Sequence, residues 1–291
     1  MSPETAILCM AYGSPASEAE LEAYFTHIRS GRPPSPAALE ELTSRYRAIG
    51  GGSPLTAITR DQAAALSRRS GLPAFVGMKH APPFIADGAR EAKAAGVERI
   101  IGLPLAPHFA NMSLGSYRAS LEAVWDGELV FIPGFHDHPA FIRAVQTLIE
   151  DALAESQPDR IFFTAHSLPA RILHEGDPYK DQLLESCRLV AARLGLKDWE
   201  FAFQSASHTG EPWLGPDLLE AVERSGARDV LVCPIGFVAD HLEILYDLDV
   251  EAQGFAREKG IRIRRTRSFN ADPVFIDALA QVVADALVRV G

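Results

Sequence analysis

The chain repeats part of its own sequence, and this repeat constrains its fold more than any other feature. Residues 135–153 and 269–287 align without a gap, and eight of the nineteen aligned positions are identical. A second pair of related segments, residues 98–109 and 228–241, lies upstream of the two copies. Each member of this pair has a strand-like apolar run, a proline and a loop that carries a histidine. We therefore expect two similar structural units in one chain.

Short β-rich runs alternate with amphipathic helical stretches, which is typical of parallel sheets covered by helices on both faces. The pattern predicts eight strands, which begin near Thr5, Phe75, Arg99, Leu129, Arg160, Glu200, Asp229 and Ile261. We expect an α/β fold with two Rossmann-like units, each a four-stranded parallel sheet flanked by helices, over residues 1–153 and 154–291. The last helix belongs to the repeat but could pack back on the first unit.

Several residues mark the ends of the expected helices. Ser17 and Glu20 match a capping box at a helix start. Four glycines follow periodic stretches, where a left-handed closing residue is favoured: Gly71, Gly96, Gly195 and Gly226.

Composition excludes some classes of function. The formal net charge is -10, which argues against nucleic acid as a partner because such ligands need a basic footprint. No stretch approaches the roughly 18 uncharged apolar residues of a membrane span, and the N-terminus lacks the basic leader of a signal peptide. We expect a cytoplasmic protein. Cys9, Cys187 and Cys233 lie scattered over predicted strands and a helix, which favours buried, reduced thiols over a disulfide framework.

Ligands of open parallel sheets bind beyond the carboxyl ends of the strands, so a site is expected in a cleft between the two units. The unusual residues after strands are Tyr12, His166, the loop from Ser205, and residues 240–243. Tyr12 and His166 each follow the first strand of a half. They could therefore face one flat ligand from opposite walls, although each residue alone is more often a hydrogen-bonded loop residue or a packing aromatic.

An acidic pattern follows the seventh predicted strand. Glu243, Asp247 and Glu251 recur every four residues and would form one carboxylate stripe on a helix. Apolar residues surround the stripe, which would suit a polar cleft, but Asp240 and Glu243 also match a capping pair, and acidic stripes are usually solvated. Spacing alone favours neither interpretation. Carboxylates that lead to an imidazole would suit a divalent ion such as Fe²⁺ that passes through.

A cationic cluster lies in the N-terminal part of the chain, although the chain is acidic overall. It comprises four arginines within twenty residues, a tyrosine and the end of a Gly-rich turn: Arg29, Arg32, Arg45, Arg47, Tyr46 and Ser53. The cluster is either a solvated helix face or a site for carboxylates, which guanidinium groups bind in bidentate fashion. The second interpretation predicts a polycarboxylate ligand.

Eight motifs run in order along nearly the whole chain: MAYGSP, YFTHIRSGRPP, RYRAIGGGSPL, GMKHAPPF, LAPHF, AHSLP, GEPWLGPD and GFVADHLEILYDLDVEA. In these motifs the chain resembles the ferrochelatase family, and it is most similar to the coproporphyrin-type enzymes of Gram-positive and related bacteria. The resemblance implies two chelatase-type units with a porphyrin cleft between them. It also implies insertion of Fe²⁺ into coproporphyrin III, to give coproheme in haem biosynthesis.

The resemblance assigns roles to particular residues. The family's catalytic histidine and glutamate, which would also contact the metal, fall on His166 and Glu243. Asp247 and Glu251 match an acidic ridge proposed for iron entry, and Tyr12 matches a tyrosine that can lie beneath the metal as an axial ligand. The porphyrin-binding positions are Tyr12 and, for the propionates, Arg29, Arg45, Tyr46, Ser53 and Tyr117.

The resemblance implies no permanent cofactor, since Fe²⁺ is a substrate. No cysteine set matches the iron–sulfur cluster of some relatives, so none is expected, and His208 stands where relatives often have another residue. Expected partners are the porphyrin, the iron porphyrin product and, transiently, neighbouring haem-pathway enzymes. The alternatives are a protoporphyrin IX ferrochelatase, a non-catalytic haem or metal carrier with the same cleft, and a cobalt or nickel chelatase for a corrinoid-type macrocycle, which shares the fold.

Overall fold

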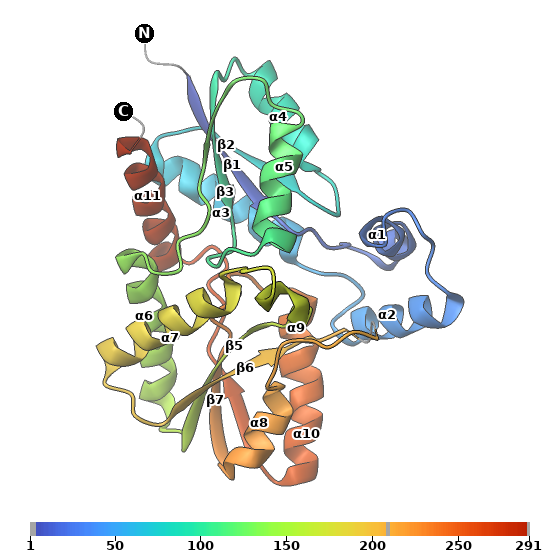
Figure 1. Ribbon diagram of the computed structural model, residues 1–291, viewed down its shortest axis with the longest axis vertical. Coiled ribbons are helices and arrows are strands. Elements are labelled where there is room, and N and C mark those ends of the chain that lie inside the picture. The colour runs from blue at the N-terminus through green and yellow to red at the C-terminus, as the bar shows by residue number, and fades with distance from the viewer. Residues whose placement is uncertain (1–3, 208–209, 290–291) are drawn as a thin grey trace. The chain divides into compact units, whose positions relative to one another are not determined.

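A computed structural model describes residues 4–207 and 210–289 of the chain (Figure 1). It contains two four-stranded parallel sheets with the same strand order. The first runs β2-β1-β3-β4 and the second β6-β5-β7-β8. In each sheet the strand that comes first in the sequence is central, and the strand that comes second lies at an edge. This shared order confirms the α/β fold and the duplication inferred from the repeat.

The strands begin at or within one residue of their predicted starts. The first sheet comprises β1 (Thr5–Ala11), β2 (Ala74–Met78), β3 (Arg99–Pro104) and β4 (Glu128–Phe131). The second comprises β5 (Arg160–His166), β6 (Trp199–Gln204), β7 (Asp229–Cys233) and β8 (Arg262–Arg265). The two central strands, β1 and β5, are almost wholly buried along their lengths, as expected for strands with helices on both faces.

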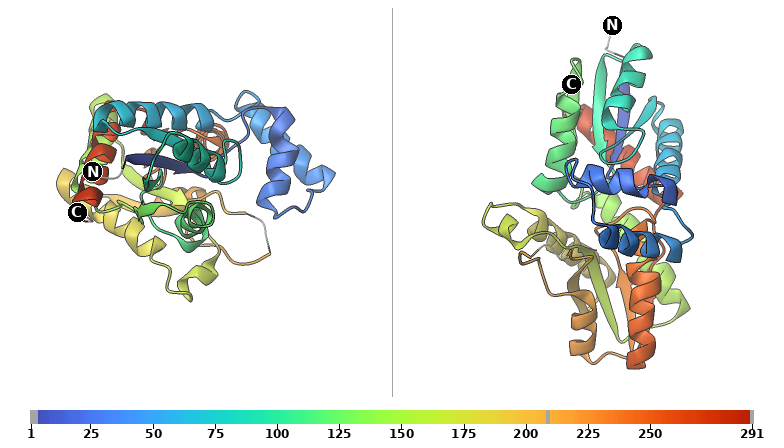
Figure 2. Two further views of the ribbon diagram at one scale, coloured as in Figure 1. Left: turned by 90° about the horizontal axis from the view of Figure 1, so that it is seen from above. Right: turned by 90° about the vertical axis from the view of Figure 1, so that its right-hand side faces the viewer.

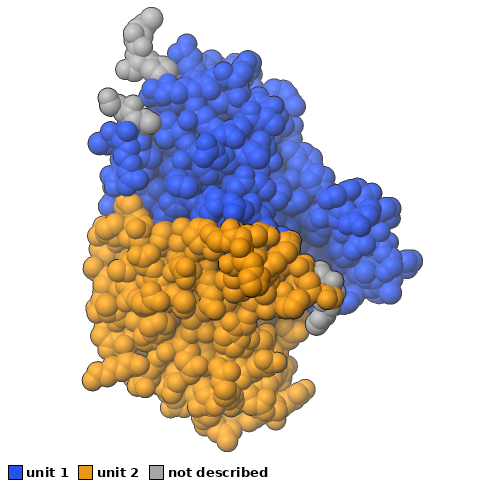
Figure 3. All heavy atoms as spheres, viewed as in Figure 1, with its two compact units in different colours: residues 1–135, 239–241, 270–291 blue, residues 136–238, 242–269 orange. Residues whose placement is uncertain are grey.

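Backbone contacts divide the described chain into two compact units (Figure 3). Unit 1 contains residues 1–135, 239–241 and 270–291, and unit 2 contains residues 136–238 and 242–269. The sequence places the boundary at residues 153 and 154, and which division marks independently folding domains stays a prediction.

The helices of unit 1 are α1 (Leu21–Ile28), α2 (Pro36–Ala48), α3 (Leu55–Ser70), α4 (Ile85–Ala94), α5 (Ser116–Glu122) and α11 (Pro273–Val288). Those of unit 2 are α6 (Pro139–Glu155), α7 (Tyr179–Leu194), α8 (Leu218–Ser225), α9 (Leu242–Leu245) and α10 (Ala252–Lys259). Short irregular turns add η1 (Glu18–Glu20), η2 (Asn111–Gly115), η3 (Ala170–Leu173) and η4 (Asp247–Glu251).

The two repeated helices, α6 and α11, are exchanged between the units. Helix α6 follows the last strand of the first sheet but packs against α7 in unit 2, and α11 follows the last strand of the second sheet but packs against α3 in unit 1 (Figure 2). Both helices begin with a proline whose preceding side chain caps the first turn. His138 accepts a hydrogen bond from the Ala140 amide, and Asp272 accepts one from the Val274 amide.

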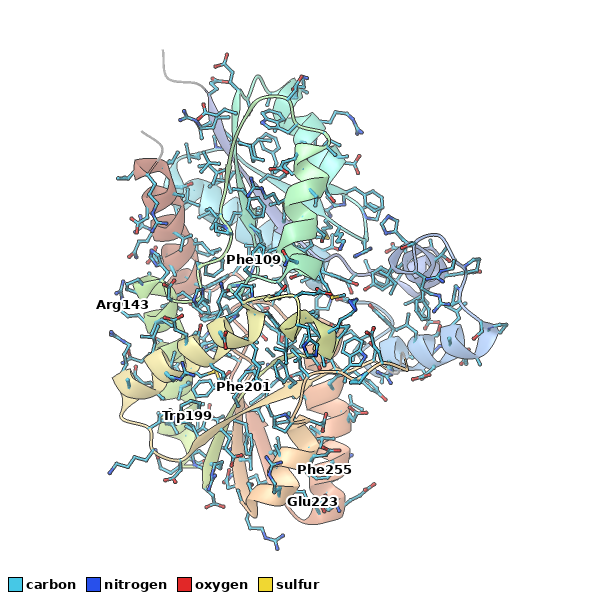
Figure 4. The ribbon with its side chains drawn as sticks, in the orientation of Figure 1. Phe109, Arg143, Trp199, Phe201, Glu223 and Phe255 are labelled. Atoms are coloured by element: carbon cyan, nitrogen blue, oxygen red, sulfur yellow. The ribbon has the colours of Figure 1, made fainter. Side chains whose placement is uncertain are left out.

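Each unit has its own apolar core. In unit 1, residues of β1 and β3 pack against α4 and α5, and in unit 2, residues of β5, β6 and β7 pack against α8 and α10. Aromatic pairs extend the second core along β6 (Figure 4). Trp199 contacts Phe163 edge to face with ring centroids 5.6 Å apart, and Phe201 contacts Phe203 at 4.9 Å. The three cysteines are buried thiols, as predicted.

The predicted helix ends are confirmed at the glycines but not at Ser17. Gly71, Gly195 and Gly226 close α3, α7 and α8 with positive φ angles. Ser17 precedes η1 without capping it through its side chain, and the Glu20 carboxylate accepts from the Ala16 amide rather than from that of Ser17. The capping-box interpretation of Ser17 and Glu20 is therefore wrong.

Within residues 4–207 and 210–289, every helix is too short or too polar to cross a bilayer.

Candidate functional site

In unit 2, the chemically unusual residues gather at the carboxyl ends of β5 and β6. His166 is the last residue of β5, and its Nδ1 atom lies within hydrogen-bond distance of the Ser167 carbonyl oxygen. Because a carbonyl oxygen only accepts, the neutral ring carries its proton on Nδ1. The Nε2 atom then has the lone pair, so it is the atom of His166 that can accept a proton or bind a metal.

Aromatic residues hold the backbone and ring of His166. The buried Tyr179 hydroxyl donates a hydrogen bond of 3.0 Å to the His166 carbonyl oxygen, and burial raises the pKa of Tyr179 well above its usual value. This phenol therefore stays a donor through the physiological pH range. The Trp213 ring lies 6.3 Å from the His166 ring, tilted by 49°. The imidazole is thus half-buried beside an indole rather than lying in open solvent.

Glu243 lies in the same unit as His166. It belongs to α9, a single turn that is anchored by the fully buried Ile244. The Gln204 side chain donates a hydrogen bond of 2.7 Å to the Glu243 carbonyl oxygen, and Gln204 pairs with His166 in the sheet. The candidate base and the candidate glutamate are therefore joined through one residue of β6.

The acidic stripe continues from α9 into η4, where the helix widens. Both the Val250 and Glu251 amides donate to the Tyr246 carbonyl oxygen, at 3.0 and 2.9 Å, so the second bond spans five residues, as in a π-bulge. Along the stripe Glu243 and Asp247 are half-buried and Glu251 is exposed. Asp247 accepts a hydrogen bond from Ser205. Of these three carboxylates, only Glu251 fits the alternative interpretation of a fully solvated helix face.

In unit 1, Tyr12 directly follows β1, as predicted. Its side chain is 43% exposed, and its ring lies 4.5 Å from that of His80. The His80 amide also donates a hydrogen bond of 2.8 Å to the Tyr12 carbonyl oxygen. His80 follows β2, so the carboxyl ends of two adjacent strands present an accessible phenol and an imidazole side by side.

A hollow of about 870 Å³ lies next to this pair. Its lining comes from α1, the following turn and His80: Ala19, Glu22, Ala23, Thr26, His27, Ser30, Gly31 and His80. The Nδ1 atoms of His27 and His80 are 2.9 Å apart. One ring therefore donates a hydrogen bond to the other, and the two rings cannot both be charged in this arrangement. Burial, aided by Lys79 and His27, lowers the pKa of His80 from 6.5 to about 4.

The lowered pKa of His80 predicts a specific dependence of stability on pH. Between pH 6.5 and about 4, the unfolded chain binds a proton at His80 that the folded chain does not bind, so the free energy of unfolding should fall as pH is lowered through this window. In His80→Phe, which keeps a ring beside Tyr12, melting temperatures should decline less over the same window. Equal pH slopes in both proteins would contradict the assignment.

The predicted carboxylate-binding residues fall into two groups. Arg29 and Arg45 lie at or near the surface, where Arg29 packs over the Phe25 ring and Arg45 pairs with Glu41 at 3.0 Å. The other three, Tyr46, Ser53 and Tyr117, are at most 5% exposed.

Two of these three hydroxyls already have a hydrogen-bond partner, and the third belongs to a residue of the apolar core. The Tyr46 and Ser14 hydroxyls are 2.9 Å apart, and the Ser53 hydroxyl accepts from the Leu55 amide at 3.3 Å. Tyr117 belongs to the apolar core of unit 1, where burial raises its pKa. Direct contact with a carboxylate is therefore open to the two arginines as they stand, whereas the other three residues would first have to be uncovered.

Sequence reasoning missed several residues that the structure brings to these strand ends. They are Lys79 and His80 after β2, His27 on α1, and Gln204 at the end of β6. Half-buried Lys79 donates to the Ser116 hydroxyl at 2.7 Å, and burial lowers its pKa. The rule that ligands bind beyond strand ends was applied after β1, β5, β6 and β7, and its extension to β2 would have found Lys79 and His80.

Across residues 4–207 and 210–289, no three His, Cys, Asp or Glu side chains converge as they would around a bound metal ion. His166 and Glu243 stay the predicted metal ligands. His208, whose role the sequence leaves open, lies outside the described residues.

Comparison with known proteins gives a consistent result. A family model for ferrochelatase matches residues 4–287. A protein of Herpetosiphon aurantiacus named ferrochelatase is 42% identical and aligns over 97% of this chain and 99% of its own length. A protein of Halalkalibacterium halodurans named coproporphyrin III ferrochelatase is 41% identical, over 97% of this chain and 96% of its own.

The fold is also similar to that of a solved chelatase. The structure of SirB from Bacillus subtilis with Fe³⁺ superposes with a TM-score of 0.62 over 97% of this chain and 95% of that one, at 13% sequence identity. At this identity the similarity concerns the fold alone.

Proposed function

The chain belongs to the ferrochelatase family and is a metal chelatase, and from this premise we propose that it inserts Fe²⁺ into coproporphyrin III to give coproheme in haem biosynthesis. The choice of porphyrin is supported by the name of the relative from Halalkalibacterium halodurans. It is also supported by the arginines of unit 1. Coproporphyrin III has four propionates, whereas protoporphyrin IX has two propionates and two apolar vinyl groups.

The observation that carries the mechanism is the tautomer of His166. Iron cannot enter a free porphyrin until the ring bends and its two N–H protons leave. With Nδ1–H directed at the Ser167 carbonyl, His166 Nε2 accepts one pyrrole proton, releases it to water and then accepts the second, and the same hydrogen bond stabilises the imidazolium that forms each time. Side chains that fit the bent ring better than the flat one lower the barrier further, because only interactions stronger in the transition state accelerate the step.

The carboxylates act on the metal rather than on the ring. Glu251, Asp247 and Glu243 run from exposed to half-buried along one segment, so Fe²⁺ can exchange water for carboxylate oxygens in steps. Glu243 would be the last of these ligands before the porphyrin nitrogens. Tyr12, exposed in unit 1, is the candidate axial oxygen ligand of the product. Iron is therefore a substrate that passes through.

The cysteines support the proposal that the chain holds no iron–sulfur cluster. Burial raises the pKa of Cys9 and of Cys233 to about 12 and raises that of Cys187. Cluster ligands are thiolates and usually number four. Three protonated, buried thiols do not suit such a cluster.

The choice of porphyrin is tested by steady-state kinetics under anaerobic conditions. We expect kcat/KM to favour coproporphyrin III over protoporphyrin IX by at least about tenfold, since guanidinium groups left without carboxylates lose strong hydrogen bonds. Arg45→Ala should shrink this preference. Arg47→Ala is the control on the same helix, because Arg47 is held by two carboxylates, Glu18 at 3.0 Å and Glu40 at 3.2 Å, whereas Arg45 pairs with Glu41 one turn away on its own helix. Equal efficiency on both porphyrins, or a preference for protoporphyrin IX, would overturn the substrate assignment.

A further inference from the structure

We propose that Gln204 is a positioning residue that fixes the Glu243 segment relative to His166 during iron insertion. The inference rests on the proposed function and adds to it a residue that makes no contact with the reacting atoms. Gln204 is the last residue of β6 and is 3% exposed. Its backbone and side chain bind the two elements that carry the candidate catalytic groups.

The backbone of Gln204 holds the turn after His166. Gln204 is the register partner of His166 in the parallel pair β5–β6. Its carbonyl oxygen accepts a hydrogen bond of 2.7 Å from the Ser167 amide. Ser167 is also the residue whose carbonyl receives the Nδ1 proton of His166. Gln204 therefore holds the residue whose carbonyl sets the tautomer of the candidate base.

The side chain of Gln204 holds the glutamate segment. Its Oε1 atom accepts a hydrogen bond of 2.8 Å from the Thr164 hydroxyl on β5, and its Nε2 atom donates one of 2.7 Å to the Glu243 carbonyl oxygen. A carbonyl oxygen only accepts, so a flipped amide would place two acceptors against each other. The hydrogen bonds with the Thr164 hydroxyl on β5 and the Glu243 carbonyl on α9 therefore fix a single orientation of the Gln204 amide.

Helix α9 is four residues long and is the first turn of a helical stretch that continues through η4 into α10. Contacts at this first turn therefore fix where the stretch begins relative to the sheet. Next to Gln204, Ser205 adopts a positive φ of 62° and donates to the Asp247 carboxylate. Two consecutive residues, the last of β6 and the one that follows it, therefore bind the first two acidic residues of the stripe. Packing of Ile244 fixes the depth of α9, and the Gln204 amide fixes its place along β5 and β6.

The test is Gln204→Leu, which keeps side-chain bulk but removes both hydrogen bonds of the amide. We expect kcat to fall by about tenfold or more and KM for Fe²⁺ to rise, with porphyrin affinity within about twofold of wild type. In a Glu243→Gln background, the same substitution should change single-turnover rates by less than about twofold, since the group it positions is already disabled. An equal factor in both backgrounds would show that Gln204 does not act through Glu243.

Two further sets of variants separate positioning from general destabilisation. Gln62→Leu removes another buried amide, one that donates to the Asn270 carbonyl at 2.9 Å in unit 1, and it should lower the melting temperature with unchanged kcat and KM. Thr164→Val should reproduce part of the Gln204 effect, and Thr164→Ser should restore it. This pair also serves as the test if Gln204→Leu does not fold.

The inference and the proposed function fail in different ways. The kinetics are measured with whichever porphyrin the wild-type protein metallates, so a wrong porphyrin assignment leaves this test intact. An active wild type whose Gln204→Leu and Thr164→Val variants keep wild-type kinetics would overturn the inference alone. A wild type that forms no metalloporphyrin would overturn the proposed function, and the inference with it.

Discussion

Replacing His166 by alanine is expected to lower kcat for iron insertion by about 10²–10⁴-fold, the range typical of a lost general base. The Nδ1 proton of His166 is directed at the Ser167 carbonyl, so Nε2 is the ring atom whose lone pair can accept a proton at the end of β5. Porphyrin affinity should change by less than about tenfold, because the ligand is held mainly by its carboxylates and its apolar area.

Two measurements check this expectation. Anaerobic single-turnover rates report the chemical step, and fluorescence titration with the metal-free porphyrin reports binding. Tyr179→Phe is a useful companion, since it removes the 3.0 Å hydrogen bond to the His166 carbonyl but leaves the imidazole in place. It should reduce the rate far less than His166→Ala. Turnover near the wild-type rate in His166→Ala would rule out the role of this residue as proton acceptor.

Glu243→Gln is expected to lower kcat by at least about 10²-fold, because a neutral amide is a poor ligand for a hard divalent ion. The fold should change little. Gln matches Glu in shape, and even the loss of a capping interaction would cost less than about 2 kcal/mol. Loss of activity without loss of stability therefore distinguishes a metal-handling carboxylate from a helix cap.

Asp249→Asn provides the matched control for Glu243→Gln. Asp249 lies on η4 in the same segment, but its carboxylate pairs with Arg265 at 2.7 Å. The control variant should lose some thermal stability and keep its kcat. The opposite pattern in Glu243→Gln, a sharp fall in melting temperature with activity retained in the folded fraction, would favour the capping interpretation.

Much of the fold could be predicted because local sequence and burial agree. Buried central strands such as β1 and β5 are short apolar runs, and the prolines at the starts of α6 and α11 mark both copies of the repeat. The sequence left open that the last helix packs back on the first unit, and α11 does pack against α3, whereas the packing of α6 against α7 in unit 2 was not predicted. The cleft expected between the units stays a prediction.

The site could be predicted in part. Tyr12 and His166 stand out as polar side chains at the ends of predicted strands, and the structure places them there, whereas Glu243 lies on α9, well beyond the end of β7. The burial of Tyr46 and Tyr117 was not foreseeable, since a tyrosine has both an apolar ring and a polar hydroxyl and its surroundings decide which is used. The π-type turn at η4 was missed because a spacing of four residues suits an ordinary helix as well as a widened one.

The most direct test of the central claim is a count of turnovers. Purified protein is mixed anaerobically with Fe²⁺ and a large excess of coproporphyrin III, and the visible spectrum is followed as free porphyrin becomes iron porphyrin. A chelatase converts many equivalents of porphyrin per protein, at a rate well above that of the same mixture without protein. Formation of no more than one equivalent, which stays bound to the protein, would contradict the account and indicate a haem carrier.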